Sequence, residues 1–210
     1  MGHDHPIFTR VYTRLCRLEA RGAVGQARSR VAAGLTGRVL IVGLGPASDL
    51  PLMPPGVTEV VGIEPSASMR HEAAAAVAQA RDGGLAVEVI DAVGQDLPLP
   101  DNSCDTALLA YVMCTVDDPD RTAREVRRVV RPGGNVAVVE HVAAPAGSLL
   151  LRAQRAVAPL WGRCAGGCHP DRDTRAVLRA AGFDVSGLRD ERLVPLPPVS
   201  PALVGMAVAP

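Results

Sequence analysis

The residues best suited to chemistry begin at Gly43-Leu44-Gly45-Pro46, directly after the apolar segment 39–42. Two glycines separated by one residue let a chain reverse sharply and present backbone N–H groups with no side chain in the way. Turns of this kind at the end of a first strand bind adenosine-bearing cofactors. Glu64 ends the next apolar segment about 20 residues later, where a carboxylate can accept hydrogen bonds from both ribose hydroxyls. These residues predict a nucleotide-type pocket.

Three further groups follow later apolar segments. Asp91-Ala92-Val93 ends the third, Tyr111 follows the fourth, and His141 follows the fifth. Because the carboxyl ends of parallel strands meet at one edge of a sheet, we expect all three to face the same cleft. Tyr111 and His141 are therefore the candidate catalytic residues. The alternative for His141 is a structural histidine that orders the strand end beside Glu140.

The hydrophobic pattern predicts the elements that must position these groups. Apolar runs alternate with helical stretches, which is typical of an α/β fold with a doubly wound, mostly parallel sheet and ligands at its carboxyl edge. A proline-rich connection at 195–201 separates two last strands and predicts an antiparallel hairpin at the sheet edge. The expected strands are 38–42, 59–63, 86–90, 106–110, 136–140, 183–188 and 203–209, and the expected helices are 67–81, 119–130, 148–157 and 171–181.

The first part of the chain has a different pattern. Apolar residues recur at helical spacing over 7–35, with Gly22 and Gly25 as a break, so two helices are expected. We therefore predict a helical flank or lid at 1–36 and one globular domain at 37–210.

Composition excludes several classes of function. The 22 basic residues are all arginine, which excludes lysine Schiff-base chemistry and a phosphate-loop NTPase. The 22 acidic residues balance that charge, and aromatic residues make up only 2%, so neither a basic surface nor stacking platforms for nucleic acid are expected. The predicted partner is a small molecule, with no nucleic-acid partner.

Cysteine content and hydropathy indicate the compartment. Five cysteines, an odd number, follow no secretory leader and predict reduced thiols in the cytoplasm. No segment approaches the roughly 18 apolar residues that a bilayer requires, so no membrane partner is expected.

The loop 161–169 invites a metal hypothesis, because Cys164, Cys168 and His169 lie close in sequence and His3 and His5 could join them. Structural zinc normally uses four ligands from recognisable paired spacings, which these residues lack. We therefore predict no metal, and expect this loop to pack over the acceptor opening with Trp161 as a hydrophobic wall.

Two downstream segments carry a family resemblance. The stretch 94–105 contains an acid, a Leu-Pro-Leu-Pro-Asp turn and a strand beginning at Asp105, and 125–134 ends in Arg-Pro-Gly-Gly. In this order they resemble class I S-adenosylmethionine-dependent methyltransferases over roughly 38–141. The resemblance implies S-adenosylmethionine as cofactor. It would be held by Gly43, Gly45, Pro46, Glu64, Pro65, Asp91, Ala92 and Val93.

A narrower resemblance extends toward the C-terminus. The segments 112–116, 140–142, 166–169, 172–174 and 181–183 look like small methyltransferases related to the alkyl-thiol S-methyltransferases of the methyltransferase-like seven group. The membrane-associated members of that group have an N-terminal anchor that we do not expect here. The resemblance implies methyl transfer to a small-molecule acceptor, with a thiol favoured, and it places Cys114 and Trp161 on the substrate side.

The glycine turn departs from the family pattern. Ile41 stands where the family has an acid, Pro46 removes one amide donor, and Ala47 replaces a third glycine, which is tolerable if its φ need not be positive. Losing one charged hydrogen bond costs about 1.5–3 kcal/mol, or roughly one to two decades of affinity. An acid restored at Ile41 is expected to tighten binding. The alternative function is a degenerate methyltransferase fold that serves as a binding protein or as a rearrangement or cyclisation catalyst.

A nicotinamide-dependent dehydrogenase would share the first two glycines and Glu64. Its fingerprint requires a third small residue for close helix packing, where this chain has Ser48, and the later turns fit it poorly. We therefore favour the methyltransferase.

Overall fold

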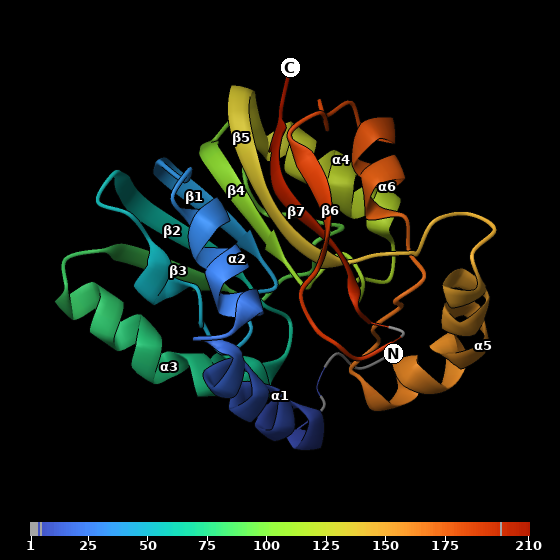
Figure 1. Ribbon diagram of the computed structural model, residues 1–210. Helices are drawn as coiled ribbons and strands as arrows, with labels where there is room; N and C mark the ends of the chain where they lie inside the picture. The colour runs from blue at the N-terminus through green and yellow to red at the C-terminus, as the bar shows by residue number, and fades with distance from the viewer. Residues whose placement is uncertain (1–3, 5, 198) are drawn as a thin grey trace.

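The computed structural model describes residue 4 and residues 6–197 and 199–210, so His3 and His5 lie outside the described residues. Its centre is one seven-stranded sheet in the order β3-β2-β1-β4-β5-β7-β6 (Figure 1). The strands are β1 (Gly37–Val42), β2 (Val57–Ile63), β3 (Ala86–Ile90), β4 (Cys104–Ala110), β5 (Val130–His141), β6 (Leu188–Arg192) and β7 (Pro201–Val208).

The sheet is parallel from β1 to β5 and antiparallel at its C-terminal edge. β1 pairs in parallel with both β2 and β4, so Val42 lies beside Ile63 on one side and Leu109 on the other. β7 runs antiparallel to both β5 and β6. The doubly wound, mostly parallel fold with an antiparallel edge hairpin is therefore confirmed, and the carboxyl ends of β1, β2, β3, β4 and β5 meet at one rim.

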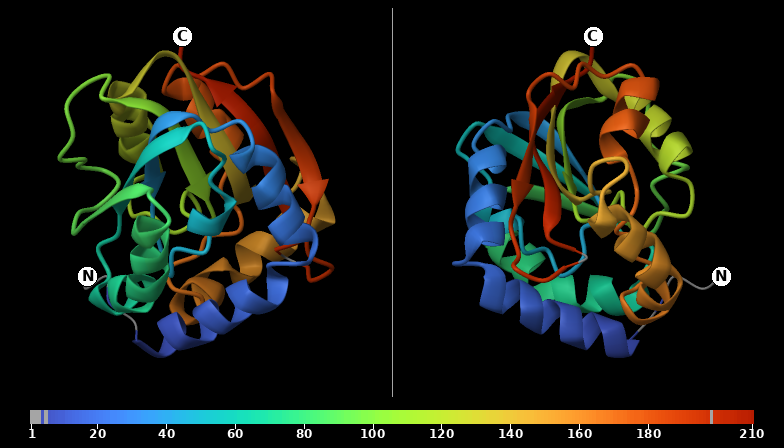
Figure 2. Two further views of the ribbon diagram at one scale, coloured as in Figure 1. Left: turned by 90° about the vertical axis from the view of Figure 1, so that its left-hand side faces the viewer. Right: turned by 45° about the vertical axis from the view of Figure 1, so that its right-hand side comes forward.

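Helices cover both faces and the rim. Their bounds are α1 (Pro6–Glu19), α2 (Ala23–Ala32), α3 (Ala67–Asp82), α4 (Pro119–Val129), α5 (Leu149–Cys164) and α6 (Thr174–Ala180), with a short 3₁₀ helix η1 (Leu50–Leu52). Figure 2 shows α1 below the carboxyl ends of the parallel strands, where it contacts α3. None of the helices in the described part of the chain is long and apolar enough to cross a membrane.

Strand alternation builds two cores from one sheet. Val39 and Ile41 point into the cluster under α2 and α3, whereas Leu40 and Val42 point into the cluster under α4 and α6. All four side chains are buried, as continuous apolar strands in a doubly covered sheet require. This burial fixes the strand ends that carry the candidate site.

Side-chain caps place the helix starts. Ser66 accepts a hydrogen bond from the Met69 N–H at the start of α3, and Asp118 accepts one from the Arg121 N–H at the start of α4. The hydroxyl of Ser148 accepts one in the same way at α5. These caps agree with the expected starts of the three helices within one residue.

Several expected elements are wrong in extent: β5 begins at Val130 and not at 136, and α6 spans Thr174–Ala180 and not 171–181. The strand expected at 183–188 is absent apart from an isolated bridge at Asp184, and the edge strand β6 begins only at Leu188. β6 is mostly charged, as exposed edge strands tolerate, so its sequence lacks an apolar signal. The helix expected to end at 157 continues through Pro159 to Cys164, and Trp161 therefore lies in a helix and not in a loop.

Candidate functional site

The glycine turn has the backbone conformation that its sequence predicts. Gly43 and Gly45 both lie in the left-handed region, at φ of 68° and 55°. A Cβ at Gly43 would come within 2.7 Å of Val112 Cγ2, so the space there is available only to glycine. The turn thus brings bare backbone against the segment that follows β4.

Ala47 shares the left-handed conformation, with φ of 58°, and is fully buried. An alanine is readily tolerated at this position only if its φ is negative, and Ala47 does not meet that condition. A non-glycine residue in this region costs about 1–2 kcal/mol, which the surrounding packing must offset.

Glu64 lies against this turn as predicted. Its Oε2 accepts a hydrogen bond from the Gly45 N–H at 2.8 Å, and its Oε1 accepts one from the Ser66 N–H at 2.9 Å. The residue is buried. Two backbone donors hold the carboxylate at the ends of β1 and β2, with Pro65 half-buried between them and α3.

Asp91 lies at the next strand end and is more exposed. Its Oδ2 pairs with Arg70 at 2.7 Å, and Arg70 also donates to the Glu64 carbonyl. Ala92 and Val93 are half-buried beside it. The arginine thereby joins the two strand ends that were predicted to hold the cofactor.

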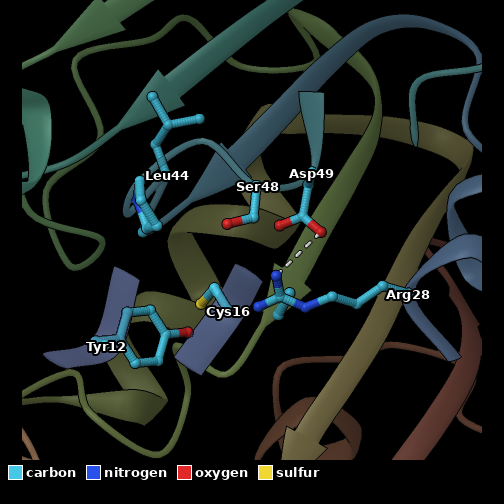
Figure 3. A pocket seen from close by; sticks show the side chains of 9 residues that line it. Tyr12, Cys16, Arg28, Leu44, Ser48 and Asp49 are labelled. Atoms are coloured by element: carbon cyan, nitrogen blue, oxygen red, sulfur yellow. Dashed lines mark ion pairs between the residues drawn. The ribbon is translucent and has the colours of Figure 1, made fainter. Parts of the chain in front are cut away.

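A buried ion pair that sequence analysis missed lies beside the turn (Figure 3). Arg28 Nη1 of α2 is 3.5 Å from Asp49 Oδ1, and Tyr12 and Cys16 of α1 line the same pocket with Gly43, Leu44 and Pro46. Among the described residues, Arg28 Nε and Asp49 Oδ1 have no hydrogen-bond partner. Burial raises the pKa of Asp49, and Arg28 opposes that rise. The cavity left between these side chains is only about 10 Å³.

One signal could have found Arg28. It lies in α2 four residues after Val24 and three before Val31, both buried, so a charged residue occupies the apolar stripe of the helix. Buried arginine is uncommon unless paired, which makes such a position informative.

Tyr111 and His141 come together as predicted. Their ring centroids are 4.5 Å apart with the planes tilted by 59°, and the Arg28 guanidinium lies 5.5 Å from the Tyr111 centroid. Tyr111 has φ of 57°, an uncommon conformation for an aromatic residue, and burial raises its pKa. The ring therefore connects the Arg28 and Asp49 pocket to His141.

Glu140 is fully buried and holds the turn after β4. One oxygen accepts hydrogen bonds from the N–H groups of Val112 and Met113, each at 2.8 Å. Burial raises its pKa to about 7, and the two N–H donors oppose that rise. Glu140 thus orders the backbone beside Tyr111, a role that sequence analysis did not assign to it.

Two sulfur atoms and one ring nitrogen, all able to bind a metal, converge at the same rim. The sulfurs of Cys114 and Cys168 and a ring nitrogen of His141 all lie within 4.8 Å of one another. The Cys168 sulfur is 3.8 Å from His141 Nδ1. A hydrogen bond from Cys114 lowers the pKa of Cys168 to about 5, and hydrogen bonds from His141 and Trp161 act in the same direction.

This cluster differs from the one considered in sequence. Cys164 is exposed and His169 is exposed, whereas Cys168 is buried and joins Cys114 from a distant part of the chain. His169 contributes only its backbone, whose N–H donates to the Cys114 carbonyl at 2.7 Å. Cys114 itself is buried and not open to solvent.

The residues present suit S-adenosylmethionine. Two left-handed glycines provide open backbone, and Glu64 provides a carboxylate for a ribose. Arg28 and Asp49 form an ion pair but leave Arg28 Nε and Asp49 Oδ1 without a hydrogen bond, and their charges suit the carboxylate and the ammonium group of the methionine end. Asp49 would then serve in place of the acid that is missing at Ile41.

Comparison with known proteins agrees with this geometry. Residues 40–138 match a family model described as a methyltransferase domain. The thiol S-methyltransferase TMT1B of Rattus norvegicus is 32% identical over 176 residues, covering 81% of this chain and 70% of the relative.

Two solved structures have the same fold. The [4+2]-cyclase SpnF has a TM-score of 0.63 and 29% identity over 79% of this chain, which spans only 58% of that protein. A methyltransferase from Thermotoga maritima has a TM-score of 0.65 and 23% identity, covering 98% of this chain and 100% of that one, and it supports the fold alone. With the TMT1B match, these results show that the chain belongs to the class I S-adenosylmethionine-dependent methyltransferases.

Proposed function

We propose that this methyltransferase transfers a methyl group from S-adenosylmethionine to a small thiol. The observation that supports cofactor binding most directly is the buried Arg28 and Asp49 ion pair beside the glycine turn, in which Arg28 Nε and Asp49 Oδ1 make no hydrogen bond. A buried polar atom without a partner is costly, so a site that retains two of them is suited to a ligand that satisfies both.

The rest of the cofactor follows the strand ends. Glu64 accepts the ribose hydroxyls beside Gly45 and Pro65, and Asp91, Ala92 and Val93 line the adenine side. When bound, S-adenosylmethionine supplies an activated methyl group on a sulfonium. The protein therefore has mainly to align the acceptor and exclude water.

The acceptor side is formed by Tyr111, His141, Trp161 and Cys114. The two rings lie between the Arg28 pocket and the cysteine cluster, which is where a nucleophile must approach the methyl group. For a thiol, the reactive form is the thiolate, which a nearby imidazole favours by hydrogen bonding or charge. Support for a thiol acceptor comes from the similarity to the thiol S-methyltransferase TMT1B. That alignment covers 176 residues and so extends beyond residues 40–138, which match the methyltransferase-domain model.

A second candidate function has its own observations. SpnF is named a [4+2]-cyclase, and this chain shares 29% identity with it. Ile41 stands in place of the family acid, and the cavity of about 10 Å³ beside the turn has room for no more than one water. These observations suit a methyltransferase fold that serves as a binding protein or as a cyclisation catalyst.

Calorimetric titration with S-adenosylmethionine and S-adenosylhomocysteine separates the two functions. Submillimolar binding supports methyl transfer, and no binding supports the reassigned fold. Glu64→Ala is expected to weaken binding at least about tenfold, since it removes charged acceptors worth roughly 1.5–3 kcal/mol. The matched control is Glu88→Ala, an exposed acid on β3.

The acceptor is tested on protein that binds the cofactor. A panel of a thiol, a phenol and an amine, followed by mass spectrometry of the products, should yield the methyl thioether as the main product. A methylated phenol or amine with no thioether would reject the thiol.

A further inference from the structure

We propose that Cys114, His141 and Cys168 bind a zinc ion whose fourth position takes the acceptor thiol. The proposal of an ion site depends only on how these three side chains are arranged. The proposal that the acceptor thiol binds at the fourth position rests on the proposed function. The three ligand atoms come from the turn after β4, the end of β5 and the loop after α5, and they converge within 4.8 Å of one another.

The separations suit a tetrahedral ion. Zinc bonds of about 2.3 Å to sulfur and 2.0–2.1 Å to nitrogen imply sulfur-to-nitrogen distances of roughly 3.6 Å. The Cys168 sulfur lies 3.8 Å from His141 Nδ1. The other two separations are at most 4.8 Å, so coordination needs these atoms to approach by about 1 Å or less.

The donor set also suits zinc in its chemistry. Two thiolates and a neutral imidazole bring a net charge of about zero with a divalent cation, which lowers the cost of placing the ion among buried side chains. Both cysteines are buried, and His141 is partly exposed. Two cysteines and one histidine with a fourth position open to substrate is a ligand set of catalytic zinc sites.

The fold holds the three ligands in place before any ion binds. Glu140 fixes the turn that carries Cys114, through the N–H groups of Val112 and Met113. The His169 N–H donates to the Cys114 carbonyl, so the two cysteine segments are joined directly.

Two further contacts complete this frame. Arg172 donates to the carbonyls of Met113 and Val116 at 2.7 and 2.6 Å, and the Tyr111 ring packs on His141. Such outer contacts orient ligands and are worth roughly 10–100-fold in metal affinity.

An ion at this site would activate the acceptor thiol. A coordinated thiol loses its proton to solvent near neutral pH, because the cation stabilises the thiolate. The thiolate sulfur then forms a bond to the methyl carbon as the carbon–sulfonium bond breaks, and the products are a methyl thioether and S-adenosylhomocysteine. His141 acts as a ligand in this scheme, and no separate base is needed.

Metal titration of the whole protein tests the site without an activity assay. The protein is treated with chelator, kept in a non-thiol phosphine reductant, and titrated with Zn²⁺ against a chromophoric chelator, then with Co²⁺ as a spectroscopic probe. We expect one ion per chain, and with Co²⁺ a thiolate-to-metal charge-transfer band and the intense visible bands of four-coordinate cobalt.

Cysteine variants identify the ligands. Cys114→Ser and Cys168→Ser should each lose more than about tenfold in Zn²⁺ affinity, since even outer-shell changes cost roughly that much. Cys164→Ser is the matched control, because it changes an exposed cysteine in the same region, and it should bind like wild type. S-adenosylhomocysteine binding by each variant shows that the fold is intact.

The outcomes separate the two halves of the proposal. The metal site is overturned if the wild-type protein binds no ion. It is also overturned if Cys168→Ser keeps the wild-type Zn²⁺ affinity and the cobalt charge-transfer band. Either result would leave Cys168 as a reactive thiolate that binds no metal. Addition of a small thiol should shift the cobalt spectrum, and an unaltered spectrum overturns the acceptor role. If the ion binds and the thiol shifts the spectrum but no thioether forms, the proposed methyl transfer fails and the metal site stands.

Discussion

At the scale of single residues, the site depends on side chains that look out of place in sequence. Arg28 is charged on an apolar stripe, and Tyr111 and Ala47 have positive φ without being glycine. Strained or buried polar residues of this kind concentrate where a ligand binds. Each of them lies near the rim where β1 and β4 end, beside the candidate site.

Arg28→Ala should weaken S-adenosylhomocysteine binding by roughly one to two decades, because a charged hydrogen bond is worth about 1.5–3 kcal/mol. It should leave methylthioadenosine, which lacks the amino-acid end, almost unchanged. Isothermal titration with both ligands measures the difference, and Arg30→Ala, an exposed arginine of α2 paired with Glu191, is the control. Equal losses for both ligands would place Arg28 away from the amino-acid end.

Ile41→Glu tests whether the pocket still has room for the acid that the family carries at this position, or has adapted to the apolar side chain. Ile41 is only 1% exposed and packs in the apolar cluster under α2 and α3, so an acid there would be buried. This burial predicts a loss of stability of several kcal/mol and not the tighter binding that the family pattern suggests. Thermal unfolding and titration of the variant decide, and a stable variant with higher affinity would restore the expectation from the pattern.

At the scale of elements, α1 lines the candidate cofactor pocket. Tyr12 and Cys16 fill the space beside Gly43, and a Cβ on Gly45 would lie 3.9 Å from the Tyr12 ring. Phe8 packs on Gly166 in the loop after α5, so α1 bridges the cofactor turn and the cysteine cluster. The remaining cavity, about 10 Å³, holds at most one water.

We therefore expect cofactor binding to displace α1, as a helical lid at 1–36 would. Hydrogen exchange with and without S-adenosylhomocysteine should show altered protection in Pro6–Glu19, whereas α4 on the far face should be unchanged. Equal protection of α1 in both states would mean that the ligand binds elsewhere.

At the scale of the whole molecule, charged side chains join strands that are distant in sequence. Asp105 at the start of β4 accepts a hydrogen bond from the Arg38 N–H of β1 and one from Arg131 Nε of β5, both at 2.8 Å. These interactions lower the pKa of Asp105, with the Arg38 hydrogen bond contributing most. Because the native pKa is depressed, the stabilisation is present above the ordinary value of 3.8 and is lost as the pH falls through the lower, native value.

Asp105→Asn should accordingly lower the melting temperature at pH 7, and the difference from wild type should shrink on acidification below 3.8. The side chain is partly exposed, so the shift should be small. Differential scanning calorimetry over a pH series measures it, with Asp117→Asn, which changes an exposed carboxylate before α4, as the control. A difference that grows in acid would contradict this assignment.

The sequence by itself determined the sheet, its helices and the glycine turn with Glu64, because these depend on local periodicity and on backbone conformations that only certain residues adopt. It could not reveal the charged edge strand β6, whose pairing depends on a neighbour, or the length of α5 past Pro159. Only the tertiary structure paired Arg28 with Asp49 and brought Cys114, His141 and Cys168 together. Those contacts join segments that are far apart in the chain, so no local pattern encodes them. They form because the carboxyl ends of the parallel strands β1, β4 and β5 meet at one rim of the sheet.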